Sequence, residues 1–376
     1  MKFTIFTHVP HSKEDNLYYA YAPYVREMNV WGDNVDELVV VAPFFLGDKT
    51  AIDCSYTHEN IEFISVPNFD VLSVKSILNT ILKFPVLISI LFKAMKATDH
   101  IHLRCPGNIG LLACFVQILF PKKTKTAKYA GNWDSQSKQP WSYQLQQWVL
   151  SNTFLTRNMQ VLVYGEWEGM TKNIKPFFTA TYKEEDKRPI VPKGLNNKIN
   201  FIFVGTLVKG KNPLYAIQLV ENLYKKGIAV SLQMYGEGIE RRELERYVLD
   251  KNLESIISLE GNQTKAIVQN GYQGSCFVLL ASESEGWPKA IAEGMFWGCV
   301  PIATSVSCVP FMLDYGNRGV LLTMILEKDV KQLMRLIKNE KDYKDKQSKA
   351  VAWSRNYTLD VFEREIKKLL NNTDYY

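Results

Sequence analysis

The sequence of 376 residues lacks several features that would assign it at once to a protein class. No two of its six cysteines are spaced as CxxC, so neither a zinc motif nor a redox motif is present. The N-terminus has no apolar signal-peptide region. The stretch 105–121, which is free of charged residues, contains Pro, Gly, Asn and Gln and is shorter than the ~20 apolar residues that span a bilayer. We therefore expect a cytoplasmic protein that does not span the membrane.

A strong excess of charge and biased segments are also missing. The net charge is +6, which suits a phosphate-bearing substrate or an anionic membrane surface and does not require nucleic acid. With 46% hydrophobic and 22% charged residues, the composition excludes a disordered, collagen-like or coiled-coil chain. No internal repeat is visible. The length predicts two domains or three.

Strand-like and helix-like segments alternate along the chain, which favours an α/β fold with parallel sheets. The strand segments are continuous apolar runs, typical of sheets covered on both faces. A helix is predicted from Leu17 to Val30, and another from Thr358 to Leu370. The expected strands are 2–9, 38–44, 61–67, 100–105, 124–131, 159–166, 200–205, 229–236, 255–261, 276–282 and 299–304.

The charged segment 183–199 carries two prolines and a glycine and has no apolar periodicity, which predicts a linker. We expect an N-terminal Rossmann-like domain of residues 1–187, to which a C-terminal helix in 356–376 returns, and a second Rossmann-like domain of residues 188–355. Two doubly wound domains facing each other would leave a cleft at the carboxyl ends of their strands, where such folds bind ligands.

The segment 282–304, SESEGWPKAIAEGMFWGCVPIAT, holds the richest pattern. A strand ends, a turn containing Glu285 follows, and Pro288 stands where a helix would begin. The exposed N–H groups of that helix start would attract an anion. Glu293 follows about two turns later. Carboxylates on both sides of an anion site fit a sugar–diphosphate–ribose ligand.

The segment resembles the E-x7-E signature of retaining GT-B glycosyltransferases of family 4. Three further segments of the second half resemble that family in order and spacing: FVGTLVKGKNP at 203–213, MYGEG at 234–238 and SLEGN at 258–262. The resemblance covers the second half, whereas the first half matches only in general architecture. It implies two Rossmann-like domains and a nucleotide-sugar donor, most plainly a UDP- or GDP-sugar, with no cofactor.

The resemblance also implies roles for individual residues. Glu285 would contact the transferred sugar and Lys211 the leaving diphosphate, so these two are the predicted catalytic residues; Glu293 would hold the ribose hydroxyls. Many relatives carry an arginine where this chain has Thr206, and Lys209 is a substitute cation. The remaining predicted donor-binding residues are Gly205, Gly236, Gly238, Gly261, Asn262, Gly286, Trp287 and Pro288. No DxD-like carboxylate pair follows a strand where a metal would be needed, so no metal site is predicted.

Structural explanations compete with several of these assignments. Taken alone, the two glutamates fit a helix-dipole role and Lys211 a solvated surface lysine; the ordered glycine turns favour function. On the acceptor side we select His8, His102, Arg104 and Asn132. His102 and Arg104 share one face of a strand, which either borders the cleft or forms a hydrogen-bonded structural cluster. Asn132, in YAGNWD, is also a common turn residue.

The segment 74–96 is apolar with interspersed lysines. It is either a helix in the core of the first domain or an interfacial helix at an anionic membrane. The sequence as a whole predicts a metal-independent retaining glycosyltransferase. It would move a hexose-type sugar to a hydroxyl of a glycan or lipid-linked glycan in bacterial surface polysaccharide assembly, at the inner face of the membrane. The alternatives are a sugar-nucleotide epimerase or phosphorylase of the same fold, or a catalytically inactive sugar-nucleotide-binding or scaffold protein.

Overall fold

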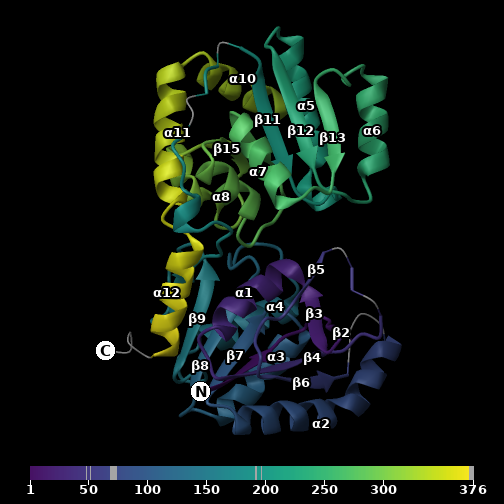
Figure 1. Cartoon of the computed structure of the whole chain (residues 1–376), viewed down its shortest axis with the longest axis vertical. Helices are drawn as coiled ribbons and strands as arrows, with labels where there is room; N and C mark the ends of the chain where they lie inside the picture. The colour runs from purple at the N-terminus through teal and green to yellow at the C-terminus, as the bar shows by residue number, and fades with distance from the viewer. Residues whose placement is uncertain (48, 51, 68–73, 191–192, 196, 372–376) are drawn as a thin grey trace. The chain divides into compact units, whose positions relative to one another are not determined.

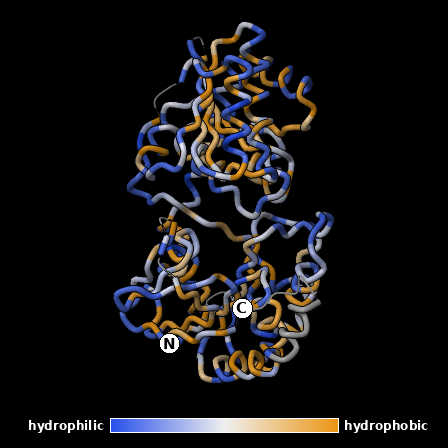
Figure 2. Tube along the Cα trace, turned by 90° about the vertical axis from the view of Figure 1, so that its right-hand side faces the viewer, coloured by the Kyte–Doolittle hydropathy of each residue, from blue (hydrophilic) through white to orange (hydrophobic). Residues whose placement is uncertain are grey.

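A computed structural model describes residues 1–376 except 48, 51, 68–73, 191–192, 196 and 372–376. The chain forms two compact units, one of Met1–Phe178 with Phe362–Tyr376 and the other of Thr179–Val361. Each unit is built on a parallel sheet covered by helices (Figure 1), so the predicted α/β fold with two Rossmann-like units is confirmed. Hydrophobic stretches run through the interior of each unit (Figure 2).

The first unit contains a seven-stranded parallel sheet with the strand order β10-β9-β8-β7-β1-β4-β6. The order reverses between β1 and β7, since β4 and β6 extend the sheet on one side and β8 to β10 on the other. Its strands are β1 (Lys2–Phe6), β4 (Glu37–Pro43), β6 (Ile61–Val66), β7 (His100–Cys105), β8 (Thr124–Tyr129), β9 (Met159–Tyr164) and β10 (Ile174–Phe177). Its helices are α1 (Ala22–Gly32), α2 (Val74–Ala97), α3 (Asn108–Val116) and α4 (Trp141–Ser151).

A second, antiparallel sheet in this unit corrects the helix predicted from Leu17. It consists of β2 (Ser12–Glu14), β3 (Leu17–Tyr21) and β5 (Asp53–Ser55). Asp15 and Asn16 adopt positive φ angles of 48° and 64°, which suit the tight turn between β2 and β3. The helix α1 therefore starts only at Ala22, with a proline in its first turn.

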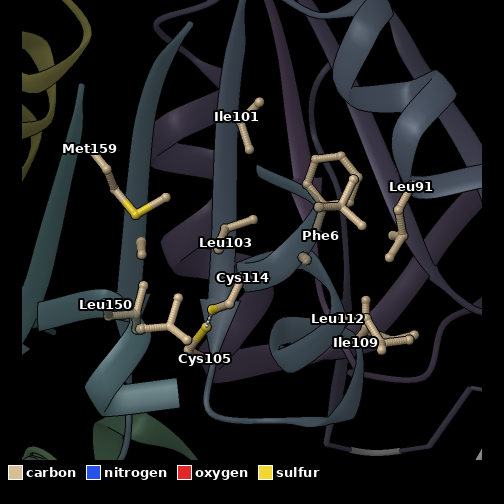
Figure 3. Close-up of a cluster of buried hydrophobic side chains, with 14 of the residues drawn as sticks. Phe6, Leu91, Ile101, Leu103, Cys105, Ile109, Leu112, Cys114, Leu150 and Met159 are labelled. Carbon is tan, nitrogen blue, oxygen red and sulfur yellow. Dashed lines mark hydrogen bonds between the residues drawn. The ribbon is translucent and has the colours of Figure 1, made fainter. Parts of the chain in front are cut away.

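One face of the first sheet packs a continuous hydrophobic core. Figure 3 shows Ile101, Leu103 and Cys105 of β7 pointing into it together with Phe6 of β1 and side chains from α2, α3 and α4. Because side chains alternate along a strand, His100, His102 and Arg104 take the opposite face of β7, as the sequence predicts.

Helix α2 covers the segment 74–96, for which the sequence allows either a helix in the core or an interfacial helix at a membrane. Leu87, Leu91 and Met95 are fully buried in the core of the first unit. Phe84 and Val86 of the same helix are exposed. The core interpretation therefore holds for one face. Within the described residues, no helix combines the length and apolarity needed to cross a membrane.

The second unit contains a six-stranded parallel sheet with the order β13-β12-β11-β14-β15-β16, which reverses between β11 and β14. Its strands are β11 (Ile199–Val204), β12 (Val230–Tyr235), β13 (Ile257–Gly261), β14 (Phe277–Leu280), β15 (Val300–Thr304) and β16 (Val320–Leu322). Its helices are α5 (Pro213–Lys225), α6 (Arg241–Asp250), α7 (Lys265–Gly274), α8 (Lys289–Phe296), α9 (Val309–Met312), α10 (Leu326–Ile337) and α11 (Glu340–Ser354).

The predicted linker and the C-terminal helix are both anchored by specific contacts. Lys193, in the linker, donates through Nζ to the carbonyl oxygens of Tyr272 and Trp297, at 3.0 and 3.2 Å, so this segment is fixed to the second unit. The last helix, α12 (Leu359–Leu370), brings Phe362 onto Phe177 with ring centroids 5.4 Å apart. The predicted return of the C-terminal helix to the first unit is therefore confirmed.

Candidate active site

Four loops of the second unit meet at the carboxyl edge of its sheet. They follow β11, β12, β13 and β14 and comprise residues 205–212, 236–238, 261–262 and 281–288. Because β11 and β14 are neighbours at the point where the strand order reverses, the first and last of these loops flank the position at which doubly wound sheets bind ligands.

An ion pair joins these two loops. Lys211, in a short 3₁₀ helix after β11, donates through Nζ to Glu285 Oε1 after β14. The Glu285 side chain is 8% exposed and that of Lys211 is 28% exposed, so the pair is shielded but reachable. The Glu285 backbone N–H donates to Ser307 Oγ at 3.1 Å, and Asn212 Nδ2 donates to the Ala281 carbonyl at 2.9 Å. The predicted catalytic residues are thus held side by side.

Glycines permit the close approach of the loops after β11 and β12. A Cβ on Gly236 would lie 2.0 Å from the Gly205 carbonyl oxygen, and one on Gly238 would lie 2.2 Å from that of Leu207. The Leu207 N–H donates to the Glu237 carbonyl at 2.9 Å. These two glycines are therefore required by the protein's own backbone.

Gly205 differs from these two glycines. A Cβ built on it meets no atom of the described residues nearer than 3.7 Å, which is an ordinary contact, and its φ is not positive. The unliganded protein thus gives no packing reason for a glycine at this position. Thr206 and Lys209, which follow it in the same loop, are exposed.

The loop after β13 is hydrogen-bonded to the loop after β12. Gly261 has a φ of +69°, and its carbonyl accepts from the Gly236 N–H at 2.8 Å. The Arg241 guanidinium donates to Glu237 and to the Leu259 carbonyl, at 2.5 and 3.0 Å. Asn262 is exposed beside Gly261.

The loop after β14 leads into α8 through a fixed turn. Trp287 is buried and stacks on Trp353 with ring centroids 6.0 Å apart, and the Gly286 carbonyl accepts from Cys308 Sγ at 3.0 Å. Pro288 is the residue before the first helical position, as the sequence predicts.

Glu293 belongs to a different cluster from Glu285. Its Oε1 accepts from Thr181 Oγ1 at 2.7 Å and its Oε2 from Tyr272 OH at 3.3 Å. Lys265 Nζ in turn donates to the Thr181 carbonyl at 3.0 Å. Burial raises the pKa of the Glu293 carboxyl above its ordinary value, although its hydroxyl donors and Lys289 act against this rise.

The space beside Glu293 is small in this structure. A cavity of about 20 Å³ is lined by Thr181, Tyr182, Lys289 and Glu293, which leaves room for little more than one water molecule. Binding of a ribose at Glu293 therefore requires Thr181 to move and to release its hydrogen bond to the carboxylate. Sequence reasoning missed Thr181, Tyr272 and Ser307, because no local pattern marks a residue that acts through a partner distant in the sequence.

The predicted acceptor-side residues lie in the first unit and do not form one group. His8 follows β1 at the point where that sheet reverses, against Gly107, on which a Cβ would lie 2.2 Å from His8 Nδ1. Desolvation and the Arg104 charge lower the pKa of His8. Asn132 follows β8 and accepts from the Asp134 N–H at 2.9 Å.

His102 and Arg104 are enclosed between β7 and α1. His102 is fully buried, with Nδ1 at 2.8 Å from Thr126 Oγ1 and its ring against Trp31. Arg104 donates to both carboxylate oxygens of Glu27, at 2.8 and 3.3 Å. The arrangement favours the hydrogen-bonded structural cluster over a role in acceptor binding.

The comparisons with known proteins find similarity in the second unit. Residues 184–353 match the family "Glycosyl transferases group 1". The GtfA subunit of a UDP-N-acetylglucosamine--peptide N-acetylglucosaminyltransferase from Limosilactobacillus reuteri subsp. suis is 25% identical over 169 residues, 45% of this chain and 30% of that protein. An uncharacterized glycosyltransferase of Methanocaldococcus jannaschii is 25% identical over 189 residues, 48% and 52% of the two chains. The chain thus spans between about a third and a half of the length of these relatives.

Solved structures resemble the chain over its full length. The lipopolysaccharide outer core galactosyltransferase WaaB superposes with a TM-score of 0.70 at 14% identity, covering 99% of this chain and 100% of WaaB. Anabaena HepE, solved in complex with UDP, gives a TM-score of 0.70 at 12% identity, covering 99% and 100%. The chain has the GT-B fold, and residues 184–353 of its second unit are similar to the family of group 1 glycosyl transferases.

Proposed function

We propose that the protein is a retaining, metal-independent glycosyltransferase of family 4. It moves a hexose-type sugar from a nucleotide-diphosphate donor to a hydroxyl acceptor. The observation that carries the proposal is the Lys211–Glu285 pair at the strand-order reversal of a glycosyl transferases group 1 domain. A cation and a carboxylate held together there suit a leaving diphosphate and the sugar attached to it.

The donor's diphosphate would pass the loop after β11. Gly205 supports this path, since its missing Cβ leaves open space that no protein atom needs. Lys211 would then exchange part of its contact with Glu285 for the phosphate oxygens, and the N-terminus of α8 would add N–H donors. Charge on the leaving group would develop beside a fixed cation, which lowers the barrier most if the site excludes water.

Among the donors, UDP-sugars are favoured by the proteins that resemble this chain. HepE was solved with UDP and glucose, and the GtfA relative is named for UDP-N-acetylglucosamine. A glycan acceptor in surface polysaccharide assembly is favoured by the likeness to WaaB, named a lipopolysaccharide galactosyltransferase. The exposed apolar side chains of α2, with its lysines, support a peripheral contact of residues 74–96 with an anionic membrane.

Metal independence follows from the proposed use of Lys211 and the helix start in place of a divalent ion. Within the described residues, no group of three or more His, Cys, Asp or Glu side chains is placed to hold a metal. We expect turnover to persist in EDTA. Loss of activity on chelation that is restored by Mg²⁺ or Mn²⁺ would contradict this part of the proposal.

An inactive sugar-nucleotide-binding protein is the second candidate, because Thr206 stands where many relatives carry a cationic residue. Release of sugar from UDP-glucose, UDP-galactose, UDP-N-acetylglucosamine and GDP-mannose separates the two candidates. The proposed enzyme hydrolyses one of these donors slowly without an acceptor, and Lys211→Ala abolishes the release. Tight donor binding with no release and no transfer would favour the inactive protein.

A further inference from the structure

A basic pocket lies in the first unit, at the edge of its sheet opposite to His8. Its walls come from the turn before β8, the segment before β9 and the start of β10, so it opens at the amino ends of these strands. Its volume is about 570 Å³, which lies within the range of small-molecule sites. It shares no lining residue with the loops around Lys211 and Glu285.

Among the residues that the structure describes, four cationic side chains line this pocket and no carboxylate does. They are Lys122, Arg157, Lys172 and Lys175. Within the part of the chain that the structure describes, Lys122, Arg157 and Lys172 form no ion pair with an acidic side chain. Arg157 instead lies over the ring of Phe154, with its guanidinium carbon 4.5 Å from the ring centroid. Lys122, Arg157 and Lys172 thus gather positive charge that no acidic side chain of the described residues neutralises, which favours an anionic occupant.

The uncharged walls are held in place by hydrogen bonds. Asn158 Nδ2 donates to the Pro121 carbonyl at 3.1 Å and so ties two walls together. Asn173 Nδ2 donates to the Leu150 carbonyl at 2.8 Å and to Thr156 Oγ1 at 3.0 Å. The cations therefore surround a fixed scaffold.

Gln160 supplies an independent sign of a ligand. It is 4% exposed and lines the pocket, and its buried Oε1 has no hydrogen-bond partner among the described residues. A buried polar atom without a partner costs free energy, so a ligand that donates a hydrogen bond to it would bind more tightly. A phosphate oxygen without a proton cannot donate, whereas a hydroxyl group can.

From these observations we propose that the pocket is an accessory site for a phosphorylated polyol or sugar. The phosphate lies among Lys122, Arg157 and Lys172, and a hydroxyl of the same molecule donates to Gln160. The ligand is either a free sugar phosphate or the hydroxylated headgroup of a phospholipid, since both present the same two groups.

The first experiment measures binding of glucose 6-phosphate and of inorganic phosphate to the whole protein by calorimetry. We expect glucose 6-phosphate to bind more tightly, because only it carries hydroxyls for Gln160. The double variant Arg157→Gln with Lys172→Gln should weaken binding by about tenfold or more. Gln160→Met should remove the preference for glucose 6-phosphate over inorganic phosphate. The control Lys138→Gln removes an exposed lysine of the same unit outside the pocket and should leave both affinities unchanged.

The second experiment uses phosphatidylglycerol and phosphatidylcholine vesicles. Binding to phosphatidylglycerol that the double variant abolishes, and that free glycerol phosphate competes away, assigns the site to a lipid headgroup. Binding of glucose 6-phosphate alone assigns it to a free sugar phosphate. The proposal is overturned if neither ligand binds, or if the double variant and Lys138→Gln behave alike.

Discussion

Lys211 and Glu285 form an ion pair that joins the loop after β11 to the loop after β14, although 74 residues separate them in the sequence. The contact lies where the order of the second sheet reverses. In the unliganded protein the lysine is therefore already placed and desolvated on one side by its carboxylate partner. A donor diphosphate would meet a cation that needs little reorganisation, which is the condition under which electrostatic stabilisation of a leaving group is strongest.

Replacing Lys211 by alanine should lower kcat by about 10²-fold or more, because the cation acts on charge that develops in the transition state. The fold should be retained, since the lysine is partly exposed. Initial rates of donor hydrolysis and transfer, with circular dichroism, measure both effects. Lys226→Ala, at an exposed position after α5, is the control. Unchanged turnover in Lys211→Ala would remove this residue from the mechanism.

Substituting two glycines of the donor loops should have different effects, one on the stability of the fold and the other on binding of the nucleoside diphosphate. Gly238→Ala should lower the free energy of unfolding by about 1–3 kcal/mol, because its Cβ would meet the Leu207 backbone. Gly205→Ala should leave stability nearly unchanged and weaken nucleoside diphosphate binding, since only a ligand needs that space. Urea unfolding and calorimetric titration measure the two quantities, and Gly210→Ala, with no atom within 4 Å of its Cβ, is the control. Wild-type affinity in Gly205→Ala would refute the proposed diphosphate path.

Deprotonation of the Glu293 carboxyl should lower the free energy of unfolding as the pH rises. Its pKa is above the ordinary 4.5 in the folded state, so the folded protein binds more protons than the unfolded chain between the two values. Wild type should therefore lose stability relative to Glu293→Gln as the pH rises from 4.5 through the raised pKa, with a constant difference above it. Urea unfolding at a series of pH values measures this difference. The exposed Glu283→Gln is the control, and a pH-independent difference for Glu293→Gln would contradict the cause we assign.

Thr181 should compete with the ribose for Glu293. Thr181→Val removes the hydroxyl donor at 2.7 Å from the carboxylate and keeps the size of the side chain. We expect UDP to bind about threefold to tenfold more tightly, the scale of one hydrogen bond of about 0.5–1.5 kcal/mol. Calorimetry measures this, with Thr179→Val in the same segment as the control. Equal or weaker UDP binding in Thr181→Val would show that the two groups do not compete.

The sequence predicts the second unit better than the first. Its strands β11, β12 and β13 end in glycine turns, and a switch from continuous apolar runs to helical periodicity marks the elements from β11 to β15, whereas β16 and the helices α9 to α11 were not predicted. In the first unit the aromatic run at Leu17–Tyr21 mimics a helix start, and only pairing with β2 and β5 makes it a strand. The short β10 escaped prediction, because its four residues include a lysine and a proline.

The candidate site, too, contains residues that the sequence predicts and contacts that it does not. The positions of Lys211, Glu285 and the glycines follow from strand ends, which the sequence marks. The contact of Glu293 with Thr181, however, joins residues 112 apart in the sequence, and no local pattern reports it. His102 and Arg104 show the converse. Alternation along β7 gives their shared face, but only the position of α1 with Glu27 determines that this face is enclosed.

The most direct test compares Glu285→Gln with Glu293→Gln, because the first substitution should mainly change kcat and the second mainly UDP affinity. Glu285 is assigned to the transferred sugar, which gains positive charge as its bond to the diphosphate breaks, so Glu285→Gln should lower kcat and leave UDP affinity nearly intact. Glu293 is assigned to the unreactive ribose, so Glu293→Gln should mainly weaken binding of donor and UDP. Calorimetric titration of UDP into both variants, alongside initial rates, gives the answer. Loss of UDP binding in Glu285→Gln, or unchanged UDP binding in Glu293→Gln, would contradict the proposed orientation of the donor.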